Sequence, residues 1–322
     1  MKILFITSNR LGDAVISSGI LDYLGKKYPS SEITVFCGPL AEGIFKPFPH
    51  VKEVIALSKE PYAGHWRKLW VRCINTNWDI IVDLRDSAVS RLLRANKRYI
   101  WGKQDDKNLH KVEQNAAILK LKDTPAPTLY FSNKTIEKAK KLVPDGKEPI
   151  LALGPAANWP GKTWPAENFI ELIGKITSSD GVLPNARIAV FAAPGEEDIA
   201  YQVLNSVPES RRIDVIAKGK PEIAAAGIQR CDFYIGNDSG LMHCAAAAGV
   251  PTLGLFGPSY PHLYQPWGKH AAYISTPETF DELVSYEGYD SRTVTTSLMG
   301  SLTIEAAYKA ACNLWKSINK DD

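Results

Sequence analysis

The stretch YIGNDSGLMHCAAAAGVPTLGLFGPS, residues 234–259, contains a strand, a turn, a helix and the beginning of a second strand. Its first apolar run ends at Asn237 and Asp238, and a Ser-Gly turn follows. Small residues then continue in a helical pattern until Gly249 and Pro251 stop it, and another apolar run begins at once. Because two strands joined through a helix form a parallel pair, this stretch predicts an α/β fold with a buried parallel sheet.

The same alternation runs along the rest of the chain. Strand candidates lie at 2–7, 32–38, 51–57, 79–85 and 98–102 in the first half, and at 149–154, 186–193, 212–217, 231–238 and 251–257 in the second. Helix candidates include 14–27, 166–177, 240–248 and 304–318. Turn and charged residues interrupt the pattern between 143 and 149. We therefore expect two Rossmann-like domains facing each other across a cleft, 1–146 and 147–322, with the closing helix a candidate for packing back on the first.

Length and composition agree with a two-domain globular protein of 322 residues, 45% of them apolar. The opening apolar run MKILFI is too short for a signal sequence or a membrane span. The five cysteines are odd in number and lack CxxC spacing: Cys37, Cys73, Cys231, Cys244 and Cys312. We expect them to be reduced thiols in a cytoplasmic protein, without a metal site.

Charge is distributed unevenly around a net value of +3. Residues 1–150 carry +9 and the remainder −6. Many of the basic residues lie in one run: Arg85, Arg91, Arg94, Lys97, Arg98, Lys103, Lys107 and Lys111. Such a run is either an ordinary solvated surface or the contact for an anionic partner, such as a phosphorylated acceptor or an acidic membrane face. No nucleic-acid-binding motif accompanies it.

The turn inside the opening stretch has the chemistry of an anion site. The amides of Ser239, Gly240 and Leu241 have no intrahelical partner at the start of the predicted helix, whose dipole is positive there. Gly240 allows a phosphate to approach closely, and Ser239 adds a hydroxyl donor. His243 lies one turn further, where it can face the ligand or bond back to Asp238. The alternative is that Asp238 only caps the helix and His243 only packs.

Loops after three other strands reach the same edge of the second sheet. In the loop at 154–169, the ammonium of Lys162 can neutralise a phosphate. In the loop at 192–200, Glu196 offers a carboxylate to ribose hydroxyls, although helix capping explains an acid there equally well. Together with the loop at 256–262, these residues predict a nucleotide diphosphate site.

The first βα turn, TSNRLGDAVISSG at 7–19, has different chemistry. Asp13 lies where the dinucleotide fingerprint GxGxxG would provide glycines for a pyrophosphate. A carboxylate repels a pyrophosphate, which disfavours a nicotinamide dehydrogenase. Asp13 is therefore either a reactive carboxylate bordering the cleft or a helix cap.

These motifs resemble those of glycosyltransferase family 9, the heptosyltransferases of lipopolysaccharide inner-core synthesis. RLGDAVIS, GKTWP, NDSGLMHCAAAAGVPTLGLFGPS and the closing helix follow the family's order over nearly the whole chain. The resemblance implies a GT-B fold, an ADP-sugar donor on the second domain, a lipid-linked acceptor on the first, and no metal. It also implies that Asp13 is the catalytic base, Lys162 a phosphate contact and 238–243 the donor loop. The chain departs from the family at Thr163, where relatives often have Arg or His, and around Asn158, a further donor-contact candidate.

An inverting transfer needs a base for the acceptor hydroxyl and positive charge for the leaving diphosphate. Asp13 is the candidate for the first task. Lys162 and the helix start at 239–241 are candidates for the second, without a metal, because the acid pairs 105–106 and 321–322 read as solvated loops. Candidate acceptor contacts are Gly12, Arg85, Ser87 and His110. A peripheral visit to the inner membrane face would suit such an acceptor.

Two other functions fit the same fold. A sugar-nucleotide epimerase would need catalytic acids around a single substrate and no acceptor. A non-catalytic sugar-nucleotide-binding protein would need only the donor loops, and the presence of Asp13 argues against it. The sequence therefore favours a glycosyltransferase.

Overall fold

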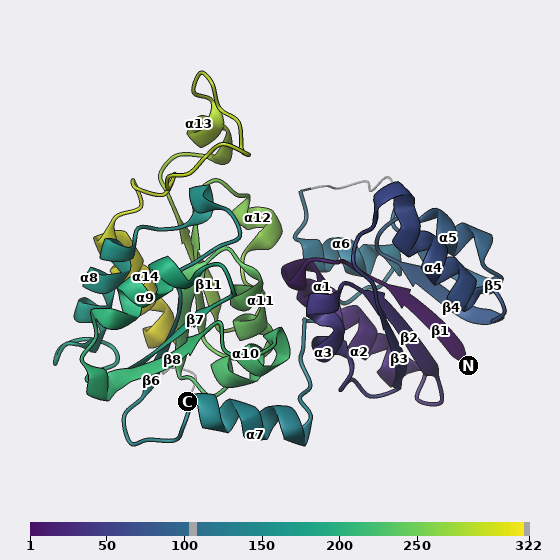
Figure 1. The fold of residues 1–322 in the computed structure, drawn as a ribbon, viewed down its shortest axis with the longest axis horizontal. Coiled ribbons are helices and arrows are strands. Elements are labelled where there is room, and N and C mark those ends of the chain that lie inside the picture. Colours follow the sequence, from purple (N-terminus) through teal and green to yellow (C-terminus); the bar gives the residue numbers. More distant parts are fainter. Residues whose placement is uncertain (103–107, 319–322) are drawn as a thin grey trace. The chain divides into compact units, whose positions relative to one another are not determined.

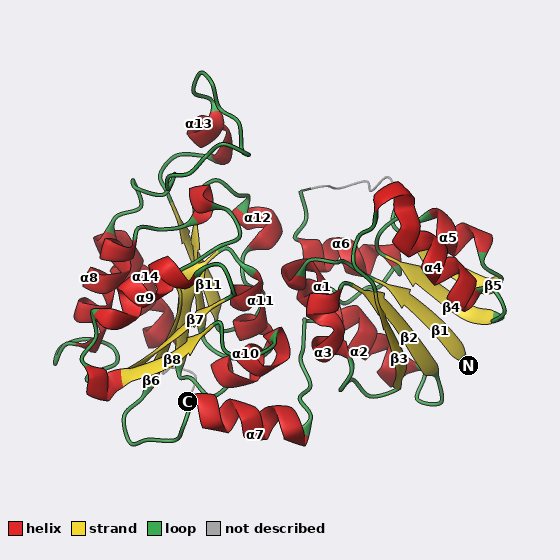
Figure 2. Ribbon diagram, in the orientation of Figure 1, coloured by secondary structure: helices red, strands yellow, loops and turns green. Residues whose placement is uncertain are grey.

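The computed structural model describes residues 1–102 and 108–318. Contacts divide the chain into a first unit, Met1–Ser132 with Lys220–Glu222, and a second unit, Asn133–Gly219 with the residues from Ile223 onward. In each unit the strands form a central layer with helices on both faces (Figures 1 and 2). Four residues noted in the sequence lie outside the described ranges at 103–107, namely Lys103, Asp105, Asp106 and Lys107, as does the acid pair at 321–322.

The first unit contains five strands: β1 (Lys2–Ile6), β2 (Glu32–Cys37), β3 (Val51–Ala56), β4 (Trp78–Asp83) and β5 (Ala95–Ile100). Its helices are α1 (Leu11–Ile16), α2 (Ser18–Lys27), α3 (Glu42–Phe45), α4 (Gly64–Cys73), α5 (Ala88–Leu92) and α6 (Lys111–Ile118). The second unit contains β6 (Ile150–Gly154), β7 (Arg187–Ala192), β8 (Arg212–Ile216), β9 (Phe233–Asn237), β10 (Thr252–Phe256) and β11 (Ala271–Ser275). Its helices are α7 (Asn133–Leu142), α8 (Ala166–Thr177), α9 (Glu197–Asn205), α10 (Pro221–Ile228), α11 (Gly240–Ala247), α12 (Pro261–Tyr264), α13 (Phe280–Val284) and α14 (Ile304–Ile318).

The first sheet has the strand order β3-β2-β1-β4-β5, and every pair in it is parallel. The central strand β1 is apolar because both of its faces are covered. Leu4 and Ile6 belong to a core with Leu69 of α4, while Phe5 points to the other face and packs edge-on against Phe45 of α3. The alternation of side chains along β1 thus supplies both cores of this unit.

The second sheet has the order β11-β10-β9-β6-β7-β8 and is also wholly parallel. Leu151 and Leu153 of β6 share a core with α8, α9 and α14. Ile150 and Ala152 belong to a second core with α10 and α11, on the other face of the sheet (Figure 1). From β6 the chain first builds outward through β7 and β8, and then returns to β9 on the opposite side of β6. The strand order therefore reverses between β6 and β9.

The predicted α/β class with two Rossmann-like units is confirmed, and all ten predicted strands are present. β5 begins earlier than the predicted run at 98–102. Its first residue, Ala95, already pairs with Trp78 of β4, although polar residues follow it. β11 was not predicted. It is a short edge strand without a long apolar run, which is the kind of strand that sequence periodicity detects least well.

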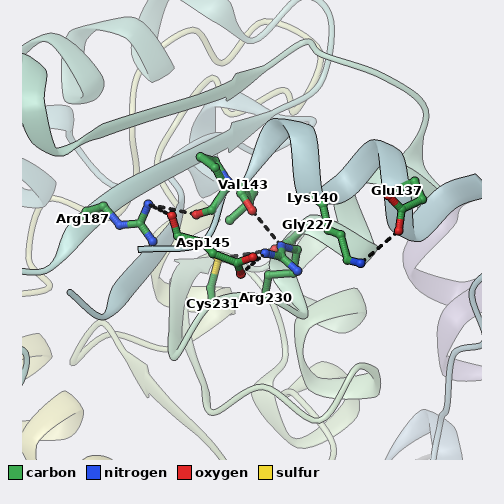
Figure 3. A network of polar contacts seen from close by, with 9 residues as sticks. Glu137, Lys140, Val143, Asp145, Arg187, Gly227, Arg230 and Cys231 are labelled. Atoms are coloured by element: carbon green, nitrogen blue, oxygen red, sulfur yellow. Dashed lines mark hydrogen bonds and ion pairs between the residues drawn. The ribbon is translucent and has the colours of Figure 1, made fainter. Parts of the chain in front are cut away.

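The first unit ends before the predicted boundary at 146 and 147 because α7 groups with the second unit. Val143, just after α7, is fully buried in a core of the second unit and its carbonyl accepts a bond from Arg230 Nε at 2.7 Å. Arg230 also pairs with Asp145 at 2.5 Å, and Arg187 donates to the carbonyl of Pro144 at 2.9 Å (Figure 3). The turn at 143–146 is therefore a structural part of the second unit.

The closing helix α14 belongs to the second unit. Ala307, Ala311 and Leu314 are buried in the core that contains Leu151 and Phe169. The apolar face of this helix is thus covered within its own unit, and a contact of the helix with the first unit stays a prediction.

Candidate functional site

Loops from neighbouring strands meet at the carboxyl edge of the second sheet. The strands β10, β9, β6 and β7 are adjacent and parallel, so the loops that follow them emerge at one edge. The reversal of strand order between β9 and β6 lies in the middle of this row, where open α/β sheets usually bind their ligands. Lys162 follows β6 and Asp238 follows β9, so these residues flank the reversal point.

Lys162 and Asp238 form an ion pair across this point, although they lie 76 positions apart in sequence. The Lys162 Nζ atom is 2.5 Å from Asp238 Oδ2, with side-chain exposures of 25% and 8%. Lys162 ends a short 3-10 helix, Pro160–Lys162. An ammonium has three donors, so Asp238 orients Lys162 while leaving further N–H groups for a ligand.

Asn237, the last residue of β9, fixes both ends of the loop that carries Lys162. Its side-chain amide donates to the carbonyl of Pro155 at 2.8 Å, and its oxygen accepts from the backbone N–H of Trp164 at 3.2 Å. Asn237 is fully buried, and so is the Trp164 ring, whose Nε1 donates to the carbonyl of Leu302 at 2.9 Å. The Lys162 loop is therefore rigidly attached to the sheet.

The helix start predicted as an anion site is the N-terminus of α11. Ser239 occupies the N-cap position, and its side chain makes no capping hydrogen bond. Asp238 precedes the cap and pairs with Lys162, so the alternative that Asp238 merely caps the helix is wrong. His243 is buried one turn into α11, with Nε2 3.9 Å from Asp238 Oδ1. The first amides of α11 and their dipole thus adjoin an ammonium.

Several buried polar atoms at this edge have no hydrogen-bond partner. In the described part of the chain six buried side-chain N or O atoms are unpartnered. Four of them lie at this edge: Trp159 Nε1, Ser239 Oγ and Ser259 Oγ in its loops, and the Tyr234 hydroxyl, which reaches from β9 to the end of β6 at Gly154. Because buried polar groups are normally satisfied, their concentration here is typical of a site that a polar ligand completes.

The Tyr234 hydroxyl lies directly beneath the site. A Cβ on Gly154, the last residue of β6, would lie only 2.0 Å from this hydroxyl, so the position requires glycine. Burial raises the pKa of Tyr234, against a smaller lowering by the neighbouring Ser239 hydroxyl. Tyr234 is therefore a neutral phenol, able to donate a hydrogen bond but not to act as a base.

The two remaining donor-site candidates lie in loops of the same edge. Glu196 is half-buried, and its Oε2 accepts from the backbone N–H of Ala193 at 2.9 Å. Burial raises the pKa of this carboxyl. Although Glu196 occupies the N-cap position of α9, its side chain makes no capping bond. Asn158 is exposed in the loop before the 3-10 helix.

The first βα turn holds Asp13 in the first turn of α1. Arg10 is the N-cap residue of this helix and its side chain makes no capping bond, so Asp13 is not the cap itself, although a carboxylate in the first turn still favours the helix dipole. The half-buried carboxylate accepts one hydrogen bond, from Ser8 Oγ at 3.2 Å. Ser8 is itself held by the backbone N–H of Arg10. Asp13 is thus positioned by its turn with hydrogen-bonding capacity left over.

Lys111, the first residue of α6, faces the same turn. Burial lowers the pKa of its ammonium, and the negative charge of Asp13 opposes this shift. Its Nζ lies 5.3 Å from the centre of the Trp101 ring and donates to Gln114 at 2.9 Å. The sequence placed Lys111 in the basic run but gave no reason to associate it with Asp13.

The candidate acceptor residues have mixed environments in the first unit. Ser87 is buried and donates through both its backbone N–H and its hydroxyl to Asp83 Oδ2, at 2.8 and 2.6 Å. His110 caps α6, with Nδ1 accepting from the backbone N–H of Val112 at 3.2 Å. Both side chains thus have structural roles. Gly12 is half-buried within α1, and the Arg85 side chain is exposed after β4. An acceptor role for all four stays a prediction.

The described residues contain neither a metal-ligand cluster nor a membrane-spanning helix. Outside 103–107 and 319–322, no group of three or more His, Cys, Asp or Glu side chains could hold a metal ion. In the same residues, no helix is both long enough and apolar enough to cross a bilayer.

The five cysteines are free thiols, as predicted. Burial raises the pKa values of Cys37, Cys73 and Cys244 to about 12. These three thiols therefore stay protonated and unreactive at neutral pH.

Sequence reasoning missed three residues at the second unit's edge: Asn237, Tyr234 and Ser259. Asn237 was visible as the end of a strand, but its partners Pro155 and Trp164 lie in a loop 82 and 73 positions away. Tyr234 read as a core residue of an apolar run. Ser259 followed the last strand of the opening stretch, and only its burial without a partner distinguishes it.

Two Rossmann-like units, each built on a wholly parallel sheet, are the architecture of the GT-B class of glycosyltransferases. A family model described as glycosyltransferase family 9 (heptosyltransferase) matches residues 95–287, which include the loops of Lys162 and Asp238 but not Asp13. The chain belongs to this family, and it is a glycosyltransferase.

Several known proteins are similar over most of their length. Lipooligosaccharide heptosyltransferase 2 of Haemophilus influenzae is 23% identical over 310 residues, covering 85% of this chain and 88% of that protein. The protein of the same name from Campylobacter jejuni is 26% identical over 287 residues, with coverages of 84% and 86%. The structure of Escherichia coli ADP-heptose LPS heptosyltransferase II has a TM-score of 0.78 at 19% identity, covering 99% of this chain and all of that one. E. coli heptosyltransferase WaaC with ADP has a TM-score of 0.72 at 20% identity, with coverages of 98% and 100%. These structural likenesses establish the fold.

Proposed function

We propose that the protein is an inverting, metal-independent heptosyltransferase that moves a heptose from an ADP-heptose donor to an anionic, lipid-linked inner-core glycan. The relatives' names supply the sugar and the lipopolysaccharide context, and E. coli WaaC has been solved with ADP and with ADP-2-deoxy-2-fluoro heptose. The observation that carries the proposal is the Lys162–Asp238 pair beside the start of α11, with the unpartnered Ser239 hydroxyl.

The donor diphosphate would bind at this start of α11. Lys162 has N–H groups beyond the one directed at Asp238, and the first amides of α11 supply further donors. The Ser239 hydroxyl gains a partner when a phosphate oxygen arrives. One ammonium and one helix dipole therefore stabilise the charge that develops on the leaving ADP, which is the task a divalent metal performs in other glycosyltransferases.

The nucleoside would be recognised next to the diphosphate. One carboxylate oxygen of Glu196 is held by Ala193, and the other is free to accept a ribose hydroxyl. Asn158, exposed on the neighbouring loop, is a second candidate contact. Both residues belong to the second unit, so the whole donor site lies within that unit.

Asp13 would act as the general base. Its carboxylate takes the proton from the acceptor hydroxyl as the hydroxyl oxygen forms its bond to the anomeric carbon of the heptose. The bond from that carbon to the diphosphate breaks at the same time, and ADP leaves with the electron pair. Attack opposite the leaving group inverts the anomeric configuration.

The acceptor would be recognised by the first unit, which carries the excess of positive charge. Arg85, exposed after β4, is the strongest of the predicted contacts because its guanidinium is accessible. An anionic lipid-linked glycan implies that the protein works as a peripheral enzyme at the cytoplasmic face of the inner membrane.

A nucleotide-binding panel combined with a transfer assay tests the proposal. Ligand binding raises the unfolding temperature according to affinity, so ADP should stabilise the protein more than UDP, GDP or CDP. ADP-heptose and a truncated inner-core acceptor should give product at the same rate with and without EDTA. A preference for UDP would refute the donor assignment, and a rate abolished by EDTA would refute the metal-independent mechanism. Binding without transfer would support the non-catalytic alternative, and a donor isomerised without acceptor would support the epimerase.

A further inference from the structure

Tyr234 lies at the donor edge of the second unit but has no task in the transfer reaction as proposed. Its side chain is fully buried, and its hydroxyl has no hydrogen-bond partner among the described residues. A buried tyrosine normally finds a partner for its hydroxyl, because an unpaired buried hydroxyl costs free energy. Phenylalanine would fill the same apolar core without that cost, so the hydroxyl itself requires an explanation.

Two glycines allow the ring of Tyr234 to reach the carboxyl edge of the sheet. Side chains alternate along a strand, so Tyr234 and Gly236 of β9 belong to the same face. A Cβ on Gly236 would lie 2.6 Å from the Tyr234 hydroxyl oxygen, and a Cβ on Gly154 of β6 would lie closer still. Gly154 and Gly236 are direct partners across the two strands. The ring therefore lies along the sheet over this glycine pair, and its hydroxyl reaches the strand ends.

The hydroxyl lies close to two side chains of the proposed donor site. Burial has the largest effect on the pKa of Tyr234 and raises it, the nearby Ser239 hydroxyl lowers it, and the negative charge of Glu196 adds to the increase. The phenol thus keeps its proton at neutral pH. It is a hydrogen-bond donor next to the residue proposed for the diphosphate and near the one proposed for the ribose.

Ser239 connects the phenol to the start of α11. It is the half-buried N-cap residue, and its Oγ has no partner. An N-cap serine normally accepts a hydrogen bond from an amide in the first turn of its own helix, but Ser239 does not. A hydroxyl accepts and donates at the same time. A bond from the phenol to Ser239 Oγ would therefore compete with capping and leave the Ser239 proton and the first amides of α11 for an anion.

We propose that Tyr234 is a positioning residue of the donor site, whose hydroxyl donates to Ser239 Oγ and directs the Ser239 proton at the donor diphosphate. This inference rests on the proposed function, because it takes the diphosphate to bind at the start of α11. The phenol acts through Ser239 since its own oxygen is shielded from solvent. Such a role concerns the diphosphate and not the base, so it applies to nucleoside diphosphates as a class.

A double-mutant cycle on the full-length protein tests this role. The variants are Tyr234→Phe, Ser239→Ala and the two combined, and the readout is ADP affinity by calorimetry. The unfolding temperature of each variant is measured without nucleotide. Ser31→Ala is the matched control, because Ser31 Oγ is also buried and unpartnered but lies in the first unit.

Tyr234→Phe should lower ADP affinity about fivefold, the factor that corresponds to one neutral hydrogen bond. In the Ser239→Ala background the same change should have no further effect, because the residue through which the phenol acts is absent. The unfolding temperature of Tyr234→Phe without ADP should equal that of the parent or exceed it, since a buried unpartnered hydroxyl is removed. Ser31→Ala should behave in the same way on heating but should bind ADP as the parent does.

Three results would overturn the positioning role. These are unchanged ADP affinity in Tyr234→Phe, an equal loss of affinity in both backgrounds, and a lower unfolding temperature of Tyr234→Phe without nucleotide, which would make the hydroxyl structural. The parent reports separately on the proposed function. If it preferred another nucleoside diphosphate, the ADP assignment would fail and the cycle would be measured with that nucleotide. A parent that bound no nucleoside diphosphate would refute both proposals.

Discussion

The turns after β1 and after β9 are built alike and differ in their neighbours. Each follows an inner strand of a parallel sheet, and each places an aspartate at or just before the start of a helix. Asp238 is buried and paired with Lys162 at 2.5 Å, whereas Asp13 is half-buried and accepts one bond from Ser8 at 3.2 Å. The same local arrangement therefore has two electrostatic states. The charge of Asp238 is balanced by Lys162, as the proposed anion site requires, whereas Asp13 makes no ion pair within the described residues, as the proposed base requires.

The neighbouring loops produce this difference. In the second unit Asn237 anchors the loop that delivers Lys162 to Asp238. Among the described residues of the first unit, the cation that interacts with Asp13 is Lys111, whose ammonium also bonds to Gln114 and lies over the Trp101 ring. The electrostatic environment of each aspartate is thus set by residues far from it in sequence.

Asp13→Asn tests the difference between the two turns most directly, because it keeps the shape of the side chain but removes its basicity. We expect transfer to fall by about a thousandfold, the usual contribution of a general base. ADP affinity should stay within twofold of the parent, because the proposed donor site lies in the second unit. Steady-state rates and calorimetric ADP binding measure the two effects. Asp79→Asn, at the opposite end of the same sheet, is the control, and a parental rate in Asp13→Asn would refute the base assignment.

Asn237→Ala tests whether the anchoring of the Lys162 loop is what makes the turn after β9 differ from the turn after β1. The substitution leaves the carbonyl of Pro155 and the N–H of Trp164 buried without partners, which should cost about 3 kcal/mol of the second unit's stability. Urea unfolding followed by tryptophan fluorescence measures the loss. ADP affinity should fall as well, since Lys162 is no longer held. An unchanged unfolding midpoint would mean that the loop is held by its other contacts alone.

Lys162→Met removes the charge that separates the two turns. ADP affinity should fall about thirtyfold, equivalent to about 2 kcal/mol for a lost charge-assisted hydrogen bond. The double variant with Asp238→Asn should recover stability, because no unpaired buried carboxylate remains, but should not recover ADP affinity. Lys175→Met, a surface lysine of α8, is the matched control. If ADP affinity recovered in the double variant, Lys162 would only neutralise the charge of Asp238 and would not contact ADP.

Ser8→Ala gives the smallest expected effect and sharpens the description of the first turn. The change removes the hydrogen bond that orients the Asp13 carboxylate, while the carboxylate itself remains. The transfer rate should fall by less than tenfold, consistent with the loss of about 1 kcal/mol of positioning. Single-turnover rates separate this loss from acceptor binding. A loss as large as that of Asp13→Asn would show that Ser8 does more than orient the base.

Much of the fold could be predicted from the sequence because its signals are local. The buried runs at 2–7 and 149–154 read as strands since every residue of a doubly covered strand is apolar. The helix of the opening stretch was bounded by its own turn residues. β11 and the start of β5 were missed because edge strands are short and partly polar, and α7 joined the second unit through the contacts of Val143 and Arg230.

The sequence by itself determined that the protein has two parallel α/β sheets, that loops with Lys162, Glu196 and Asp238 follow strands of one sheet, and that Asp13 follows a strand of the other. These conclusions need only periodicity and the rule that ligands bind at the carboxyl ends of parallel strands. Tertiary structure alone decided which side chains meet. The pairing of Lys162 with Asp238, and the anchoring of its loop by Asn237, depend on β6 lying beside β9, and strand order is set by packing between segments that no local pattern relates.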